Sequence, residues 1–78
     1  MTPREHIDAL DAAIVGLLAE RAAVVASLWE QKRARGEPLR DAPREAAIFA
    51  RVRALGAAQG LDPDAVEAVF VRVVGMAR

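Results

Sequence analysis

The residues best suited to chemistry are two cations that interrupt an apolar series near the start of the chain. Arg21 falls between Leu18 and Val24, and Lys32 follows eleven residues later. Eleven residues are about three turns of an α-helix, so both cations return to nearly the same face, roughly 16 Å apart. A guanidinium among apolar side chains is costly unless it meets an anion. The pair therefore predicts a binding site for an anionic group.

A third cation, Arg4, precedes Ile7 by about one helical turn and flanks the apolar face instead of lying in it. One shared anionic ligand would explain all three cations. The alternative for Arg21 is that its stem lies along the apolar face with its head in water, or that it pairs with a carboxylate such as Glu20 or Asp11 of a neighbouring helix.

A second charged group lies at the expected start of another helix. Asp41, Arg44 and Glu45 fall within one turn, ahead of an apolar series that begins at Ile48. Asp41 has the residue type of an N-cap, a role that does not exclude ligand binding. Arg44 and Glu45 also fit solvated surface charges. The group adds two carboxylates and one guanidinium to the candidate site.

These charges must be positioned by helices, because no segment alternates with the period of two that a strand requires. Thr2 and Glu5 have the spacing of a capping box, and Asp41 and Asp62 are suitable N-caps. Gly75 can end the last helix. We expect helices over residues 3–34, 41–59 and 63–74.

The first predicted helix is too long for a single chain of this size. At 1.5 Å per residue it measures close to 48 Å, whereas a compact domain of 78 residues would be roughly 30 Å across. Two shorter helices cannot cover the whole apolar face of such a rod. We therefore expect an all-α fold, one domain over residues 1–78 with three helices, and a homodimer in which the long first helices pair.

Composition excludes several classes of function. Eleven basic residues balance eleven acidic ones and the pI is near 6.6, so nucleic acid and anionic membranes are not expected partners. The absence of cysteine excludes disulfides, thiolate zinc sites and cysteine nucleophiles. A single histidine, His6, and a single serine, Ser27, argue against a Ser-His triad, and no metal site is expected. The charged start and the lack of a long apolar run predict a cytoplasmic protein.

The order and spacing of residues along nearly the whole chain match a known pattern. The matching residues are Arg4, Ile7-Asp8-Ala9-Leu10-Asp11, Leu17-Leu18-Ala19-Glu20-Arg21, Lys32, Pro38-Leu39-Arg40-Asp41, Arg44-Glu45, Gly60-Leu61-Asp62 and Val69-Phe70. This set resembles the all-helical chorismate mutases. The resemblance implies an intertwined homodimer of three-helix chains, in agreement with the length of the first helix.

The resemblance also implies a substrate, chorismate, which is a dicarboxylate, and a reaction, its 3,3-rearrangement to prephenate in aromatic amino acid or related biosynthesis. Such an enzyme needs no nucleophile, metal or organic cofactor. By resemblance, Arg21 and Arg4 would bind carboxylates, with Arg4 supplied by the other subunit. Lys32 would contact a carboxylate and the ether oxygen that the reaction breaks.

The remaining roles fall on the second charged group. By resemblance, Asp41 and Glu45 would hold the ring hydroxyl, and Arg44 would orient this acidic pair. We count Lys32, Arg21 and Glu45 as the catalytic residues. The apolar walls would be Ile48, Leu28, Val52 and Val74.

The sequence departs from the family pattern at its end. A Gln or Glu that contacts the ether oxygen would fall just past Arg78, and a polar residue one turn earlier would fall on Ala77. We therefore expect an enzyme that is slow alone, uses its C-terminal tail differently or is completed by a pathway enzyme. Alternatives are an isochorismate-pyruvate lyase, a mutase of an amino analogue of chorismate, and a non-catalytic dimer that binds chorismate-like ligands.

Overall fold

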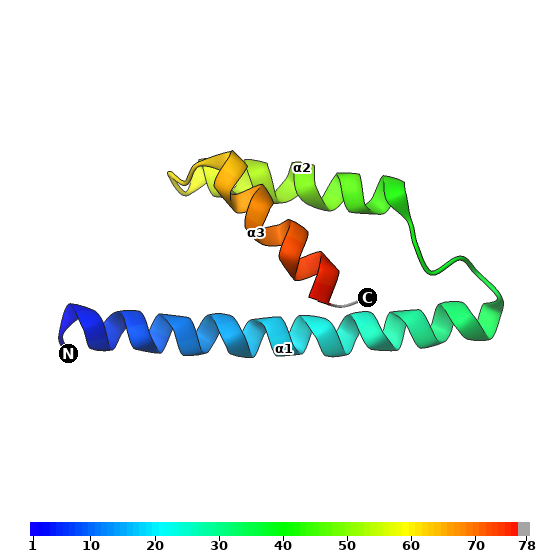
Figure 1. The fold of residues 1–78 in the computed structure, drawn as a ribbon, viewed down its shortest axis with the longest axis horizontal. Coiled ribbons are helices and arrows are strands. Elements are labelled where there is room, and N and C mark those ends of the chain that lie inside the picture. The colour runs from blue at the N-terminus through cyan, green and yellow to red at the C-terminus, as the bar shows by residue number, and fades with distance from the viewer. Residues whose placement is uncertain (77–78) are drawn as a thin grey trace.

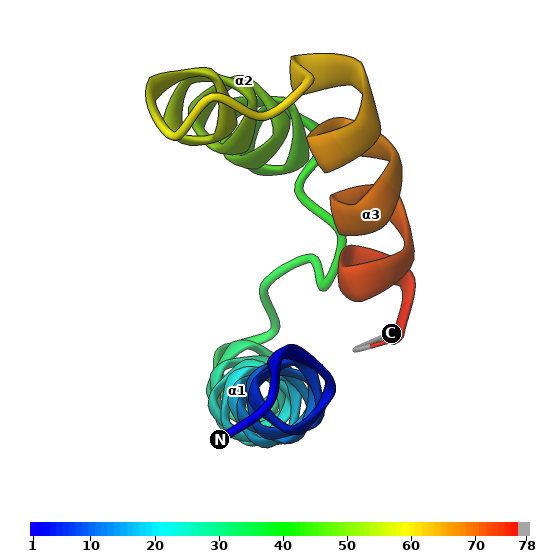
Figure 2. The same ribbon diagram turned by 90° about the vertical axis from the view of Figure 1, so that its left-hand side faces the viewer.

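The computed structural model describes residues 1–76, which form three helices and no strand (Figure 1). The helices are α1 (Pro3–Arg35), α2 (Ala42–Ala58) and α3 (Pro63–Met76). The molecule measures 51 × 23 × 15 Å, and α1 runs along the whole of its long axis. From the end of α1 the chain turns back through α2, and α3 then descends from α2 toward the middle of α1 (Figures 1 and 2). The predicted all-α fold is confirmed for these residues.

The start and the end of α1 follow from local chemistry. The Thr2 hydroxyl accepts the Glu5 backbone N–H at 3.2 Å, and the Glu5 carboxylate accepts the Thr2 N–H at 3.4 Å, so the predicted capping box is confirmed. Gly36 ends the helix in the left-handed conformation, with φ at 69°. The Glu37 N–H then donates to the Lys32 carbonyl at 2.9 Å, which is the hydrogen bond of a Schellman motif that spans more residues along the chain.

The predicted caps of α2 and α3 are also confirmed, but the end of α3 is not. Asp41 accepts the Arg44 N–H at 3.0 Å, and Asp62 accepts the Asp64 N–H at 3.0 Å. The prediction ended α3 at Val74, whereas the helix continues through Gly75 to Met76. Gly75 does not take a positive φ, so it lacks the left-handed conformation with which a glycine ends a helix.

The two shorter helices pack closely because α2 carries a glycine at their contact. Gly56 is buried, and a Cβ atom placed on it would lie 2.6 Å from the Val66 Cγ2 methyl of α3. That distance is far inside van der Waals contact, and the β-branched Val66 side chain has little rotamer freedom with which to move away. The buried apolar side chains of the described residues are Val52 on α2, and Val73 and Val74 on α3.

We expect the Gly56→Ala substitution to destabilise the protein, although alanine favours helices by about 1 kcal/mol over glycine. Overpacking a tight contact costs about 1–3 kcal/mol, and this cost outweighs the gain in helix propensity. Gly16→Ala is the control, because a Cβ at Gly16 meets no atom within 4 Å. Thermal unfolding followed by circular dichroism should give a lower Tm for the first variant and a higher Tm for the second. A Gly56→Ala protein as stable as the parent would contradict this account.

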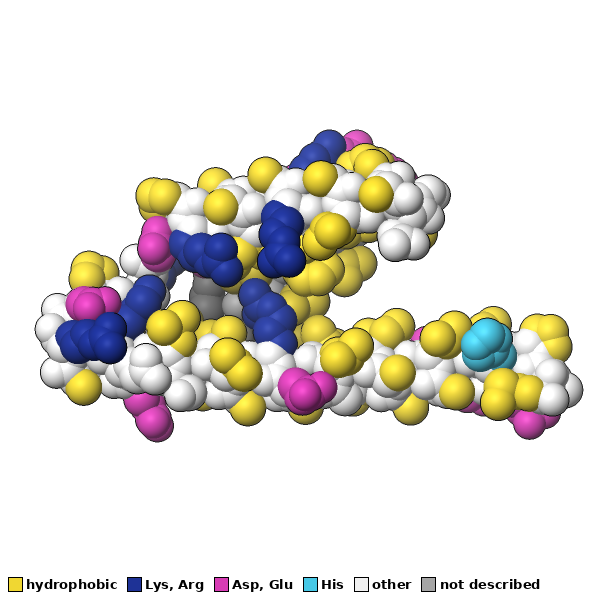
Figure 3. All heavy atoms as spheres, turned by 180° about the vertical axis from the view of Figure 1, so that it is seen from behind, with side chains coloured by type: hydrophobic (Ala, Val, Ile, Leu, Met, Phe, Trp, Pro, Cys, Tyr) yellow, Lys and Arg dark blue, Asp and Glu magenta, His cyan; other side chains and the backbone are white. Residues whose placement is uncertain are grey.

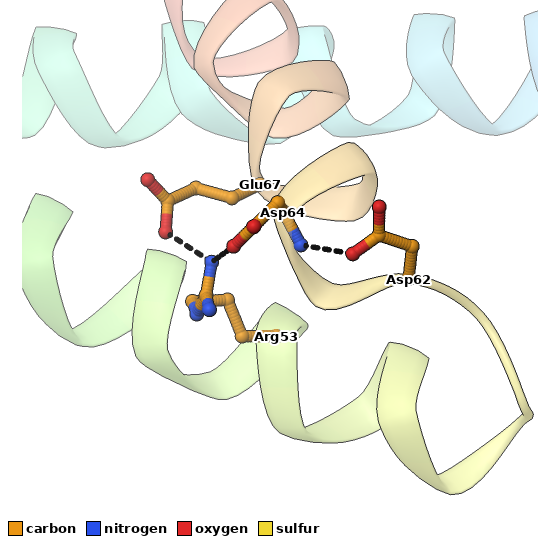
Figure 4. A network of polar contacts seen from close by, with 4 residues as sticks. All are labelled: Arg53, Asp62, Asp64 and Glu67. Carbon is orange, nitrogen blue, oxygen red and sulfur yellow. Dashed lines mark hydrogen bonds and ion pairs between the residues drawn. The ribbon is translucent and has the colours of Figure 1, made fainter.

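An ion-pair network on the surface fixes α3 against α2 (Figure 4). Nη1 of Arg53 on α2 donates to Asp64 Oδ1 at 2.8 Å and to Glu67 Oε1 at 3.1 Å, both on α3. The hydrogen bond with Asp64 is the main reason that the pKa of Arg53 is raised. Arginine keeps its charge over the whole pH range in which proteins are folded, so Arg53 is a permanent cation between the two carboxylates of α3.

The apolar face of α1 is open to solvent in the single chain. Ile7, Leu10, Ile14 and Leu17 are each more than half exposed, and no residue of α1 is buried. The end of α3 approaches α1, and Val73 and Met76 line a small hollow together with Leu18 and Ala22. None of the described helices is both long enough and apolar enough to cross a membrane.

Candidate active site

A cleft of about 140 Å³ lies where the C-terminal half of α1, the linker after it, the start of α2 and the end of α3 meet. Lys and Arg side chains gather around the hollow between α1 and α2 (Figure 3). The charged residues that line the cleft are Arg21, Lys32, Arg40, Asp41, Arg44 and Glu45. The apolar residues that line it are Val25, Leu28, Trp29, Leu39, Ile48 and Val74.

The cleft unites the two charged groups that the sequence singled out. Arg21 and Lys32 reach it from α1 and are half-buried. Asp41, Arg44 and Glu45 reach it from the start of α2. The charges from α1 therefore face a concave surface instead of extending separately into water, which favours the ligand-binding interpretation of Arg21.

Local structure orients the two carboxylates differently. Asp41 accepts the Arg44 N–H and so caps α2, and it also lines the cleft, so its role as a cap does not remove it from the candidate site. The Glu45 carboxylate lies 4.0 Å from the Arg40 guanidinium. Its side chain is 22% exposed, whereas that of Arg40 is 75% exposed. The cleft thus places acceptor oxygens opposite the donors of α1, as recognition of a hydroxylated anion requires.

Three of the four residues predicted as apolar walls lie at the cleft. Leu28, Ile48 and Val74 line the cleft, but Val52 does not. Val52 is buried elsewhere on α2, among the residues that the contact with α3 covers. Apolar spacing identified the inward face of α2 but not which part of that face meets the cleft.

Arg4 is not brought to the cleft of its own chain. It lies on the first turn of α1, seventeen residues before Arg21, which corresponds to about 25 Å along the helix axis. Its place in the site of another subunit stays a prediction.

Four lining residues were missed or given no role by the sequence. Val25, Trp29, Leu39 and Arg40 all reach the cleft. Helical spacing could have found Val25 and Trp29, which lie seven and three residues before Lys32 on the same helix. Leu39 and Arg40 belong to the linker, whose path no periodic pattern describes.

Comparison with known proteins then decides the family. The model of chorismate mutase type II matches residues 3–78. The chain belongs to the chorismate mutase type II family.

Two curated relatives agree with this membership. The T-protein of Enterobacter agglomerans is 39% identical over 71 residues, and the bifunctional chorismate mutase/prephenate dehydratase of the same organism is 34% identical over 71 residues. Each match covers 91% of this chain but only 19% and 18% of the relatives, respectively, so the chain spans about a fifth of their length. No solved structure matches.

Two further observations concern the end of the chain and the possible metal ligands. Ala77, at the position of a polar family residue, lies outside the described residues. Within the described part of the chain, no group of three or more His, Cys, Asp or Glu residues is placed to hold a metal ion. In its cleft, this chorismate mutase type II domain offers cationic donors on Arg and Lys side chains and carboxylate acceptors on Asp41 and Glu45.

Proposed function

We propose that this domain catalyses the rearrangement of chorismate to prephenate, a step toward aromatic amino acids or related compounds. The observation that carries the proposal is the cleft itself, in which Arg21 and Lys32 of α1 face Asp41 and Glu45 of α2. The rearrangement is unimolecular, since one C–O bond breaks and one C–C bond forms within the same molecule. No proton, electron or leaving group has to be supplied, so binding geometry and electrostatics suffice.

The basic residues act on the carboxylates and on the ether oxygen. The Arg21 guanidinium presents a planar pair of N–H donors that matches a carboxylate. Lys32 supplies a compact charge, which contacts a carboxylate and the ether oxygen where negative charge grows as the C–O bond breaks. These contacts hold the flexible side arm of chorismate over its ring and stabilise the transition state, which lowers the activation barrier.

The acidic residues act on the ring hydroxyl. Asp41 and Glu45 accept hydrogen bonds from the hydroxyl, and the positive charge of Arg44 orients the two carboxylates. Leu28, Ile48 and Val74 exclude water from the other side of the ring. Excluding water strengthens each electrostatic contact in the site.

One NMR experiment separates this function from its alternatives. The purified protein is incubated with chorismate and, separately, with isochorismate. Prephenate from chorismate supports the proposal. Pyruvate from isochorismate would assign the lyase reaction instead. If neither compound is converted, the domain binds chorismate-like ligands without catalysing a reaction. Addition of the amino analogue of chorismate in a third sample tests the remaining mutase reaction.

We also propose that the domain works as a homodimer whose long helices pair. The open apolar face of α1 supports this, since Ile7, Leu10 and Ile14 have no cover within the described chain. Association would also bring Arg4 of one subunit to the cleft of the other.

We expect sedimentation to give a dimer at micromolar concentration, and Ile14→Lys to reduce or abolish it. Ile14 lies in the middle of the apolar face and is 54% exposed, so a charge there would be buried unpaired on association. Ala12→Lys is the matched control, because two residues correspond to about 200° of helix rotation and place Ala12 on the opposite face. A stable monomeric parent protein would contradict the proposal.

A further inference from the structure

We propose that Arg40 is a positioning residue that holds the Glu45 carboxylate in its working orientation; this inference rests on the function proposed above. Arg40 lies in the linker between α1 and α2, and it lines the cleft. Its Nη2 atom is 4.0 Å from Glu45 Oε2. The ion pair therefore joins a basic linker residue of the cleft to a carboxylate of α2.

The two carboxylates of the cleft differ in what orients them. Asp41 is short, and its hydrogen bond to the Arg44 N–H fixes it to the backbone of α2. Glu45 has one more rotatable bond and reaches further from the helix, so a contact near its carboxylate narrows its rotamers more than a contact at its base would. Arg40 supplies a contact of this kind at the Oε2 atom.

The exposure of the two partners indicates which one works on the ligand. Both residues line the cleft, but the Glu45 side chain is 22% exposed and that of Arg40 is 75% exposed. An exposed pair of this kind contributes little to the free energy of unfolding. A small displacement of a group in a preorganised site, in contrast, can lower a rate strongly. The consequence of the pair should therefore appear in catalysis and not in stability.

The chain provides a matched control pair nearby. Arg35 Nη1 lies 3.8 Å from Glu37 Oε1, and the two side chains are 66% and 47% exposed. This pair has the same chemistry and an arginine of similar exposure, but neither of its residues lines the cleft. It reports what the loss of an exposed Arg–Glu pair does when no site is involved.

The test is a double-mutant cycle on kcat with chorismate, using Arg40→Gln, Glu45→Gln and the double variant. We expect Arg40→Gln to lower kcat about 5- to 10-fold with little change in KM, Arg40→Lys to recover much of that loss, and Arg35→Gln to have no effect. In the Glu45→Gln background, Arg40→Gln should change kcat less than about 2-fold, because the group on which it acts is gone. All variants should keep the parent Tm.

Two outcomes would overturn the inference. An equal loss in both backgrounds would mean that Arg40 acts on the substrate directly, and no loss in the parent background would mean that the pair is idle. A parent protein without turnover would defeat the proposed function instead. The cycle is then measured on chorismate affinity through the fluorescence of Trp29, the single tryptophan, which lines the cleft. If the effects of Arg40→Gln and Glu45→Gln on chorismate affinity are coupled, Arg40 is a positioning residue for Glu45. If the two effects are additive, the inference is wrong.

Discussion

Lys32→Ala should lower kcat by a factor of about 10² to 10³ or more, because it removes a positioned cation from the atom on which negative charge develops. Lys32 is half-buried in the cleft, where its charge is screened less than at the open surface. The variant should still fold, since the bond that ends α1 uses the Lys32 backbone carbonyl and not its side chain. Steady-state kinetics with chorismate measures the loss.

Arg33→Ala is the control for Lys32→Ala. Arg33 is the next residue along the same helix, carries the same charge, is exposed and does not line the cleft. Its loss should leave kcat within about 2-fold of the parent value, since substitutions of solvated surface charges have small effects. A Lys32→Ala protein with parental turnover would remove Lys32 from the mechanism and with it the assigned source of charge stabilisation.

Arg4→Ala should lower kcat/KM by about 10²-fold or more, although Arg4 lies far from the cleft of its own chain. The reason is that the guanidinium would bind a substrate carboxylate in the site of the other subunit. Because Arg4 is exposed on the first turn of α1, the substitution should not change the Tm of the assembled protein much.

Subunit exchange makes the prediction for Arg4 specific. In a dimer of one Arg4→Ala chain and one Lys32→Ala chain, one site receives both intact residues and the other receives neither. Random mixing of the two inactive variants should therefore restore about a quarter of the parent activity. If the mixture stays inactive after verified exchange, both residues act within one chain or Arg4 has another role.

Local patterns in the sequence predicted the helices well because caps act locally. Thr2, Asp41 and Asp62 each fix a helix start through a side-chain bond within three residues, so neighbouring residues determine the outcome. The end of α3 was wrong because a glycine permits a left-handed turn without requiring one. At Gly75 the helix continues directly after Val73 and Val74, which are buried.

The site was predictable where residues lie on one helix and less so where the linker brings them in. Helical periodicity alone related Arg21 to Lys32 across three turns. It could not show that Arg40 reaches the Glu45 carboxylate, because a contact across a turn depends on the path of the linker. It also could not distinguish Ile48, at the cleft, from Val52, which the cleft does not include.

The small interior of the lone chain has a consequence for how the protein acquires its structure. Within residues 1–76 only Val52, Val73 and Val74 are buried apolar side chains, each contributing about 1.5–3 kcal/mol. This is a small interior for a chain with three helices, and the apolar face of α1 adds nothing to it while that face is exposed. Folding and association should therefore form one bimolecular equilibrium, in which the midpoint of heat denaturation rises with total protein concentration and dilution alone promotes unfolding.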